Sequence, residues 1–586
     1  MFRLPQNNWP DTAAGRGVLF FVQLVNDMLS PETFESFRAL SLDTLARISE
    51  AIQTVEDIQL DRVPKAVIDP IIGELSWSLG KDPIAKLSHE LEIAAVIRNL
   101  NDPKRSLSDK ARNLRLLQCR LAATYKQSIE KAISDCFVDS KQRVRLRILT
   151  GFYCSHLLNL GYSREYILRV LNEEYLSADV QRVRRQALSR FFRRFDCSQK
   201  QITVITPLSD HFAAYLKNLG LKYRICESVN ELPTMARLEF ANSTATAFIV
   251  QKNRSFDEEG AAARAQQELS SVAAIAHLAP KVTVFDTSSA KYAFKAQAGN
   301  GVHVASRNVF NSNLDVHTAS GRRIKDLRSY TRRILTSFDD ASKERVLSSI
   351  STSSLARKSP SPEIQLISIW SAIEVLLSAP EGTARILHYV DGLLPCICLR
   401  YIRRQFVAVH DALFVLHRRK FSDLVNNELI SGATDSHTKF AAILMLPPHA
   451  NLRQSLLNLC TDNPLALHRL WKLHDDFGNP KNLANAVGAH QKRVEWQIHR
   501  IYRARNNLVH AGRVPSFLDS LILNLFEYYR STVATIVKAA HRDEKPANID
   551  QVVSDIRIEY QIFEHLAQRM KEKSAVEMED FNRIIC

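Results

Sequence analysis

Apolar residues recur at every third or fourth position over most of the chain, which is the spacing of a helix with one buried face. Clear examples in the first third are residues 42–52 and 113–122. The same pattern returns after Pro362 and continues through the C-terminal third. The expected fold class is therefore mainly α.

The pattern changes in the middle of the chain, where short β-branched or aromatic runs alternate with helical stretches. The runs are residues 202–205, 223–226, 246–250 and 282–285. Alternation of this kind predicts a small α/β module that could hold a ligand at its strand ends. A Gly-rich phosphate loop is not expected, because residues 298–301 lack the third glycine and a following helix.

Serine and proline mark the best candidate for a linker, in the stretch that ends in Ser359-Pro360-Ser361-Pro362. With 586 residues, the chain has room for about three or four domains. We expect a helical N-terminal sensor or scaffold region, a central α/β module, a Ser/Pro-rich linker and a C-terminal helical bundle. Their expected bounds are 1–200, 201–345, 346–362 and 363–586.

The chain is strongly basic, with a formal net charge of +16. An excess of cations attracts polyanions, so nucleic acid fits as a partner, and an anionic membrane surface would also fit. The N-terminus does not resemble a signal peptide, and the apolar run at 18–24 is too short to span a bilayer. A cytoplasmic protein that does not use a membrane is expected.

The spacing of the cysteines argues against a zinc site built from cysteines and against a set of disulfides. The nine cysteines include no C-x-x-C pair, and the closest two, Cys396 and Cys398, lie in an apolar setting. Buried thiols are therefore expected in place of zinc ligands or disulfides. We expect no metal and no cofactor.

The most informative stretch is residues 501–512 (IYRARNNLVHAG), near the end of a long predicted helix. Arg505 carries a permanent charge that can fork onto two phosphate oxygens, and His510 can exchange a proton near neutral pH. Asn506 shares a helix face with His510, whereas Arg505 lies further around the helix. Two copies meeting across a two-fold axis would bring both sets into one cleft. Gly512 is the expected C-cap.

Residues 505–510 resemble the R-N-x3-H form of the R-x4-6-H motif of HEPN ribonucleases, and the surroundings resemble the Apea-like HEPN group. Residues 363–377 resemble the first long helix of that group, with Trp370 and Glu374. The likeness covers roughly residues 362–562. It implies a C-terminal helical domain that dimerises, with Arg505 and His510 of both protomers lining a shared RNA cleft.

The bare spacing of the motif is weak evidence, because a basic chain rich in His matches it by chance. Arg469 and His474 have the same spacing, and Arg404 to His410 fits the looser pattern. The Arg469 and His474 pair lacks the following Asn, so a structural role is expected for it. Two readings of Glu374 stay open: an acid close to the site, or a residue at the core edge bonded to an Arg.

Arginine and phenylalanine also mix at residues 182–195, with six Arg and three Phe. Arg182, Arg185 and Arg193 could hold phosphates while Phe rings stack on bases. Alternatively, the helix buries its Phe stripe and shows its Arg to water. Arg503, just before the motif, is expected to add to RNA binding.

The expected function is metal-independent endoribonuclease activity at a homodimer, or a higher even-numbered homo-oligomer, by attack of the ribose 2′-hydroxyl. The resemblance also implies a toxin-like effector of anti-phage defence, controlled by a phage-derived or nucleotide trigger. Two alternatives stay open. One is a catalytically silent HEPN module for dimerisation or nucleotide binding, and the other is a regulator that binds nucleic acid.

Overall fold

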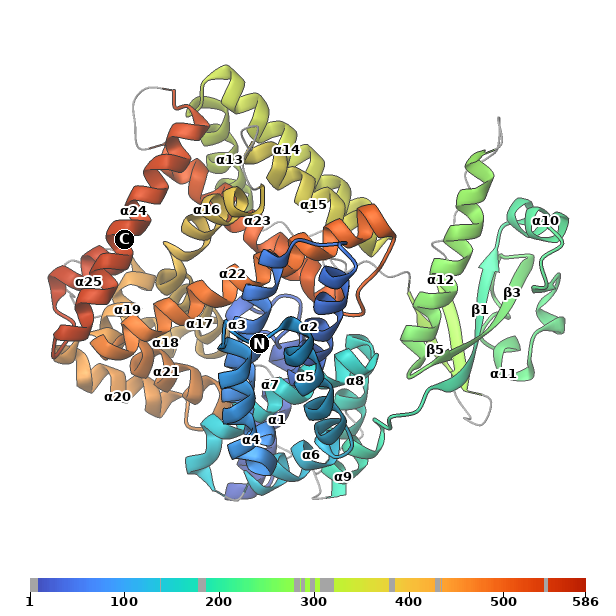
Figure 1. Ribbon diagram of the computed structural model, residues 1–586, viewed down its shortest axis with the longest axis horizontal. Helices are drawn as coiled ribbons and strands as arrows, with labels where there is room; N and C mark the ends of the chain where they lie inside the picture. Colours follow the sequence, from blue (N-terminus) through green and yellow to red (C-terminus); the bar gives the residue numbers. More distant parts are fainter. Residues whose placement is uncertain are drawn as a thin grey trace.

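The computed structural model describes the backbone of the chain outside residues 1–8, 138, 178–185, 279–284, 286–289, 296–300, 306–320, 379–384, 427–432, 434, 542–545 and 586. The side chains of residues 87–91, 140, 277 and 321–327 are also outside the described part. Helices dominate the described residues, and one five-stranded sheet stands to the side of the helical body (Figure 1). The expected fold, mainly α with a small α/β module, is confirmed.

The N-terminal region is helical throughout its described residues. Acidic and hydroxyl caps begin several of its helices, and the Asp43 carboxylate accepts from the Ala46 N–H at 2.7 Å. Its helices are α1 (Ala13–Leu29), α2 (Thr44–Gln59), α3 (Ile68–Lys81), α4 (Pro83–Asn101), α5 (Leu107–Ala122), α6 (Tyr125–Asp135), α7 (Arg143–Leu160), α8 (Arg164–Leu171) and α9 (Gln186–Arg193).

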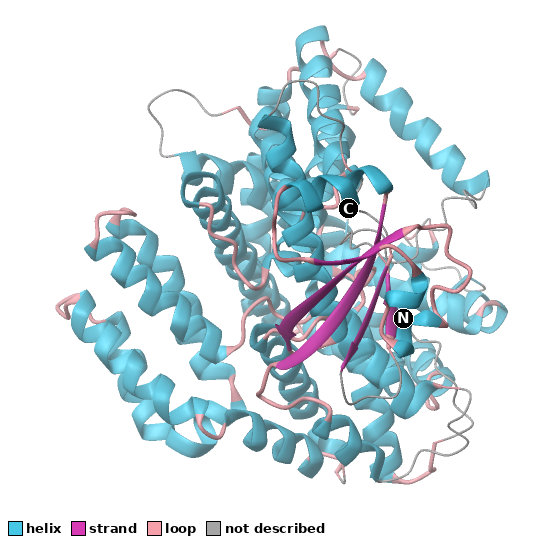
Figure 2. Cartoon of the chain, turned by 90° about the vertical axis from the view of Figure 1, so that its right-hand side faces the viewer, coloured by secondary structure: helices cyan, strands magenta, loops and turns pink. Residues whose placement is uncertain are grey.

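The central sheet has the strand order β2-β3-β1-β4-β5, and every pairing in it is antiparallel. Alanines of α12 pack against β1 and β4, and Figure 2 shows the sheet in front of the helical body. The elements are β1 (Lys200–Leu208), α10 (Asp210–Asn218), β2 (Arg224–Cys226), α11 (Thr234–Arg237), β3 (Ala247–Ser255), α12 (Glu258–Ile275), β4 (Lys291–Lys295) and β5 (Val302–Val304).

Three of the four expected strand runs lie on β1, β2 and β3. In the fourth run, residues 282–284 lie outside the described residues, and Phe285 is not in a strand. The module is joined to the N-terminal helices at α8, where Asp257 accepts hydrogen bonds from the N–H and hydroxyl of Ser163 at 2.6 and 2.9 Å. Burial raises the pKa of Asp257 to about 6.

The described residues after β5 are mainly helical. The helices are α13 (Gly321–Thr336), α14 (Asp340–Lys358), α15 (Pro362–Leu376), α16 (Arg385–Cys398), α17 (Tyr401–His417), α18 (Arg419–Asn426), α19 (Ser436–Met445), α20 (Ala450–Leu459), α21 (Pro464–Phe477), α22 (Pro480–Ala511), α23 (Leu518–Ala540), α24 (Ile549–Arg569) and α25 (Met578–Ile585). Among the helices described, none combines the length and the apolar character needed to cross a bilayer.

The expected Ser/Pro-rich linker at 346–362 is wrong for most of its length. α14 continues to Lys358 and packs along α15. Ser349 is fully buried, donates to the Ala372 carbonyl at 2.7 Å and lies 3.1 Å from the Tyr529 hydroxyl. Serine side chains are small, so the two helices can approach closely. The buried hydroxyl is satisfied because it can bond to a nearby carbonyl. Only a short turn separates α14 from α15.

The N-terminal and C-terminal helices share one hydrophobic core. Phe20 and Phe21 of α1 belong to the same buried cluster as Trp370 of α15 and Ile501 of α22. α1 also packs on α21, and α3 packs on α22. Residues 1–200 and 363–586 therefore form one helical body, although the sheet module separates them in sequence.

A buried group of charges joins the two ends of the chain within this body. Arg500 of α22 donates to the Glu50 carboxylate at 2.8 Å and to Glu74 Oε1 at 3.2 Å. Arg47 Nε donates to the same Glu74 oxygen at 3.1 Å. Burial would raise the pKa of Glu50, but Arg500 and Arg503 outweigh that effect and hold it at about 2. The cluster is stable because each charge is paired.

Replacing Arg500 with Ala should destabilise the protein strongly, because Glu50 and Glu74 would stay buried without their main cation. The expected loss is about 3–5 kcal/mol of unfolding free energy, measured by chemical denaturation. Arg419→Ala is the matched control, because the Arg419 side chain is 95% exposed and its loss should cost at most about 0.5 kcal/mol. Equal stability of the two variants would contradict a structural role for the cluster.

Candidate active site

α22 carries the motif on its last turns. The helix begins at Pro480, where the Asn479 side chain accepts from the N–H groups of Lys481 and Asn482 at 3.1 and 3.3 Å. It ends at Gly512, which has φ of +61°, and the following N–H reaches back to the Asn507 carbonyl at 3.2 Å. This left-handed cap favours glycine. The expected C-cap at Gly512 is confirmed.

Arg505 is held by two neighbours on different helices. Its Nη2 donates to Oε2 of Glu374, on α15, at 3.2 Å, and its Nη1 donates to Oδ1 of Asn506 at 3.1 Å. The buried Trp370 indole donates to the other oxygen of Glu374 at 3.0 Å. Glu374 is therefore a residue at the core edge that is bonded to an Arg. Because this Arg is Arg505 of the motif, Glu374 also lies close to the candidate site.

Arg505 also keeps an unused donor. Its Nε is buried and has no hydrogen-bond partner among the described residues, although the side chain as a whole is 20% exposed. A buried N–H without a partner costs free energy. An incoming ligand could not reach this donor without movement of the neighbouring side chains, because the atom has almost no accessible surface.

His510 lies one helical turn beyond Asn506 and is exposed to solvent. Asn506 is half-buried, whereas Val509, between them in sequence, is 46% exposed. Within one chain, the Arg505 guanidinium is directed to α15 while the imidazole faces solvent. The end of α22 therefore carries an exposed imidazole and, further around the helix, an anchored guanidinium.

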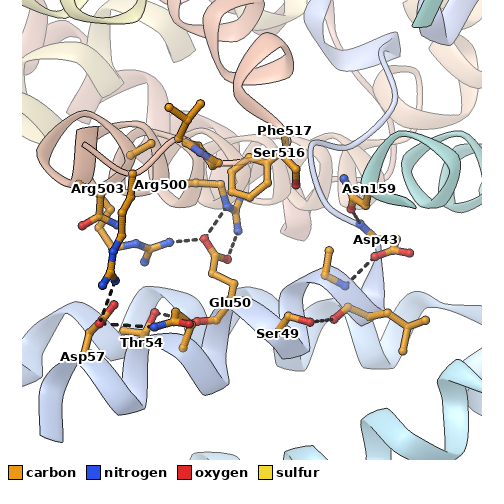
Figure 3. Close-up of a pocket in the computed structure, with 18 of the residues that line it drawn as sticks. Asp43, Ser49, Glu50, Thr54, Asp57, Asn159, Arg500, Arg503, Ser516 and Phe517 are labelled. Carbon is orange, nitrogen blue, oxygen red and sulfur yellow. Dashed lines mark hydrogen bonds and ion pairs between the residues drawn. The ribbon is translucent and has the colours of Figure 1, made fainter. Parts of the chain in front are cut away.

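A cleft of about 540 Å³ lies on another side of α22, between this helix and α2 (Figure 3). Arg500, Arg503, Asn507 and Arg513 line one wall. The facing wall includes polar residues of α2 and its N-cap, namely Asp43, Ser49, Glu50, Gln53, Thr54 and Asp57.

The sequence predicts an RNA contact for Arg503, but the structure gives this residue another partner. Its guanidinium pairs with Glu50 at the cleft, and its side chain is only 16% exposed. Burial lowers the pKa of Arg503, although Glu50 opposes the shift. Arg503 ties the motif helix to α2 and is not on an open face.

The basic segment at residues 182–195 is only partly described. Arg182 and Arg185 lie outside the described residues, and Arg193 is exposed at the end of α9. Phe191 and Phe195 are fully buried, with ring centroids 5.0 Å apart. These two rings serve the core, as the alternative reading predicted, and they are not available to stack on bases.

In the two other matches to the motif spacing, the arginine is held in an ion pair. Arg469 is buried and pairs with Asp27 at 2.6 Å, whereas His474 Nδ1 lies 2.7 Å from the Leu444 carbonyl oxygen. Arg404 pairs with Glu35 at 3.1 Å. The buried ion pair of Arg469 agrees with the structural role that the sequence predicts for this residue.

Comparison of the chain with protein-family models, curated proteins and solved structures found no match. The interpretation of the site therefore depends on its own geometry and on the resemblance of its motif.

Replacing Glu374 with Gln should lower the stability modestly, because Arg505 loses its charged acceptor. The Arg505 side chain is 20% exposed and the Glu374 side chain is 26% exposed, so solvent partly screens the pair. The expected loss is about 1 kcal/mol of unfolding free energy. Chemical denaturation measures this loss. Glu344→Gln, at an exposed position of α14, is the matched control and should have no measurable effect. A Glu374→Gln variant as stable as this control would show that the pair does not anchor Arg505.

Proposed function

We propose that the protein is a metal-independent endoribonuclease whose active site forms between two copies of the chain. The observation that carries the proposal is the end of α22, where Arg505 is anchored by Glu374 and Asn506 and where His510 is exposed. An anchored guanidinium stabilises charge on a phosphate, and an exposed imidazole transfers protons near neutral pH. RNA cleavage by its own 2′-hydroxyl needs these two groups.

In this mechanism, His510 of one protomer removes the proton from a ribose 2′-hydroxyl. The 2′-oxygen then attacks the adjacent phosphorus, and the bond from phosphorus to the 5′-oxygen breaks. His510 of the partner subunit gives a proton to the leaving 5′-oxygen. The products are a 2′,3′-cyclic phosphate and a 5′-hydroxyl end. DNA lacks the attacking group and should not be cleaved.

Arg505 would stabilise the negative charge that grows on the phosphoryl oxygens. Its Nη atoms are held by Glu374 and Asn506, so the guanidinium plane is fixed before RNA arrives. Preorganised donors of this kind are more effective than mobile ones, because they need no reorientation during the reaction.

The helices of the N-terminal region supply a route for control. Glu50 of α2 pairs with Arg500 and Arg503, on the same helix that carries the motif. A trigger that displaced α2 would therefore act on α22 directly. We place the chain among toxin-like effectors of anti-phage defence with a phage-derived or nucleotide trigger, a role that the motif resemblance supports.

Replacing His510 with Ala should lower the rate of RNA cleavage about a hundredfold or more, which is the usual effect of removing a positioned acid or base. RNA binding should persist, because the cationic groups stay in place. The measurement is cleavage of mixed RNAs in EDTA, with mapping of the new 5′-hydroxyl and cyclic phosphate ends.

His211→Ala is the matched control, since His211 is exposed on α10 of the separate sheet module. This control should cleave RNA at the wild-type rate. Cleavage abolished by EDTA, or unchanged in His510→Ala, would contradict the mechanism. A dimer without any RNA cleavage would favour the catalytically silent HEPN alternative.

Replacing Val509 with Asp should weaken dimerisation. Val509 is 46% exposed between Asn506 and His510, so a dimer that pairs two motif ends would bury it. A carboxylate there would be buried next to its own symmetry mate, so the dissociation constant should rise at least about tenfold. Sedimentation at several concentrations measures it. Val415→Asp, at a 50% exposed position of α17, is the matched control. Equal effects of the two changes would place the interface elsewhere.

A further inference from the structure

Three side chains with metal-ligating atoms converge on α17 and α19, away from the motif. His410 and Asp411 are neighbours on α17, and His437 lies in the first turn of α19. His410 Nδ1 and His437 Nε2 each lie 2.9 Å from the same oxygen of Asp411. The two imidazole centroids are 4.2 Å apart. All three ligating atoms lie within 4.8 Å of one another.

The opposite nitrogen of each imidazole also faces a polar group. His410 Nε2 lies 2.8 Å from the Ser436 hydroxyl, and His437 Nδ1 lies 3.6 Å from an oxygen of Asp435. Outer contacts of this type fix the rings of metal-binding histidines and orient their free nitrogen toward the ion. The helix cap supplies them here.

Asp435 is itself held firmly. Its carboxylate accepts from the backbone N–H groups of His437 and Thr438 at 3.0 and 3.1 Å, and from the Thr438 hydroxyl at 2.7 Å. The N-cap of α19 therefore positions Ser436 and His437 as well as starting the helix.

Exposure of the cluster is graded from one side to the other. The side chain of His410 is 7% exposed, that of His437 is 33% exposed and that of Asp411 is 62% exposed. An ion could enter from the Asp411 side, and water could occupy the remaining position. The cluster therefore differs from an exposed group of carboxylates, because two imidazoles that are buried or half-buried share one carboxylate.

We propose that His410, Asp411 and His437 bind a divalent transition-metal ion, with Zn²⁺ as the best fit. Imidazole nitrogens favour such ions over Mg²⁺ or Ca²⁺, which prefer oxygen ligands. Zinc bonds of about 2.0–2.1 Å place tetrahedral ligands about 3.4 Å apart, so each 2.9 Å contact must widen by about 0.5 Å. The exposed Asp411 side chain can make this change by rotation.

The metal would connect α17 to α19 and stabilise their packing. The site belongs to a different pair of helices from the motif, and the proposed RNA cleavage uses no metal. The inference is therefore independent of the proposed function, and each can fail without the other.

Titration of the metal-free, full-length protein with ZnCl₂ by calorimetry tests the inference. We expect one saturable site and a rise in thermal midpoint with zinc, because an ion that binds only the folded state stabilises it. Cobalt should give the visible absorption of a tetrahedral ion at the same stoichiometry. MgCl₂ should give neither signal.

His437→Ala and Asp411→Asn should abolish the site, and both change positions that are exposed enough for the fold to tolerate. Asp435→Asn should weaken zinc binding by about tenfold or more through loss of the outer carboxylate. His565→Ala, at an exposed histidine of α24, should bind zinc as the wild type does. Circular dichroism of each variant verifies folding.

Zinc binding of equal strength in wild type, His437→Ala and Asp411→Asn would overturn the inference, because the ion would then sit elsewhere on the surface. Absence of any saturable binding would overturn it as well. Neither outcome would bear on RNA cleavage by His510.

Discussion

The constraint on which the rest of the structure depends is the burial of Arg500 between Glu50 and Glu74. The side chain of Arg500 is 3% exposed, and its partners come from α2 and α3, 450 and 426 residues away in sequence. Charges in such a setting are tolerated only when all are paired, so the two ends of the chain must close on each other in one register. The shared apolar core then extends around this contact.

α22 is held on two sides by ion pairs with different helices. One side of the helix, through Arg500 and Arg503, is bound to α2, while Arg505 is directed to Glu374 of α15. Both contacts lie on one helix, so α22 connects the N-terminal region physically to the candidate site.

Local patterns predicted the parts of the structure that local physics controls. Helical periodicity, the Gly512 cap and the joint position of Trp370 and Glu374 all follow from residues close in sequence. The Ser-rich stretch was wrongly predicted to be a linker, because most of its serines lie in α14, which packs along α15. Serine can end a helix or line a helix interface, and the packing partner decides between the two. The pairing of Arg503 with Glu50, and the meeting of His410 with His437, depend on tertiary contacts that sequence spacing does not encode.

The ion pair between Arg505 and Glu374 does not use every donor of the guanidinium. A guanidinium has five N–H donors. Glu374 and Asn506 each take one of them, on different Nη atoms, and Nε is unpartnered among the described residues. In the proposed mechanism a phosphate would use the second N–H of each Nη, so it would not need to displace Glu374. The carboxylate does repel a phosphate, and this cost is offset because it holds the guanidinium in one orientation before the substrate arrives. Glu374 anchors Arg505 as other carboxylates anchor Arg500, Arg469 and Arg404, so what sets Arg505 apart is its place in the motif at 505–510, with Asn506 as its second partner.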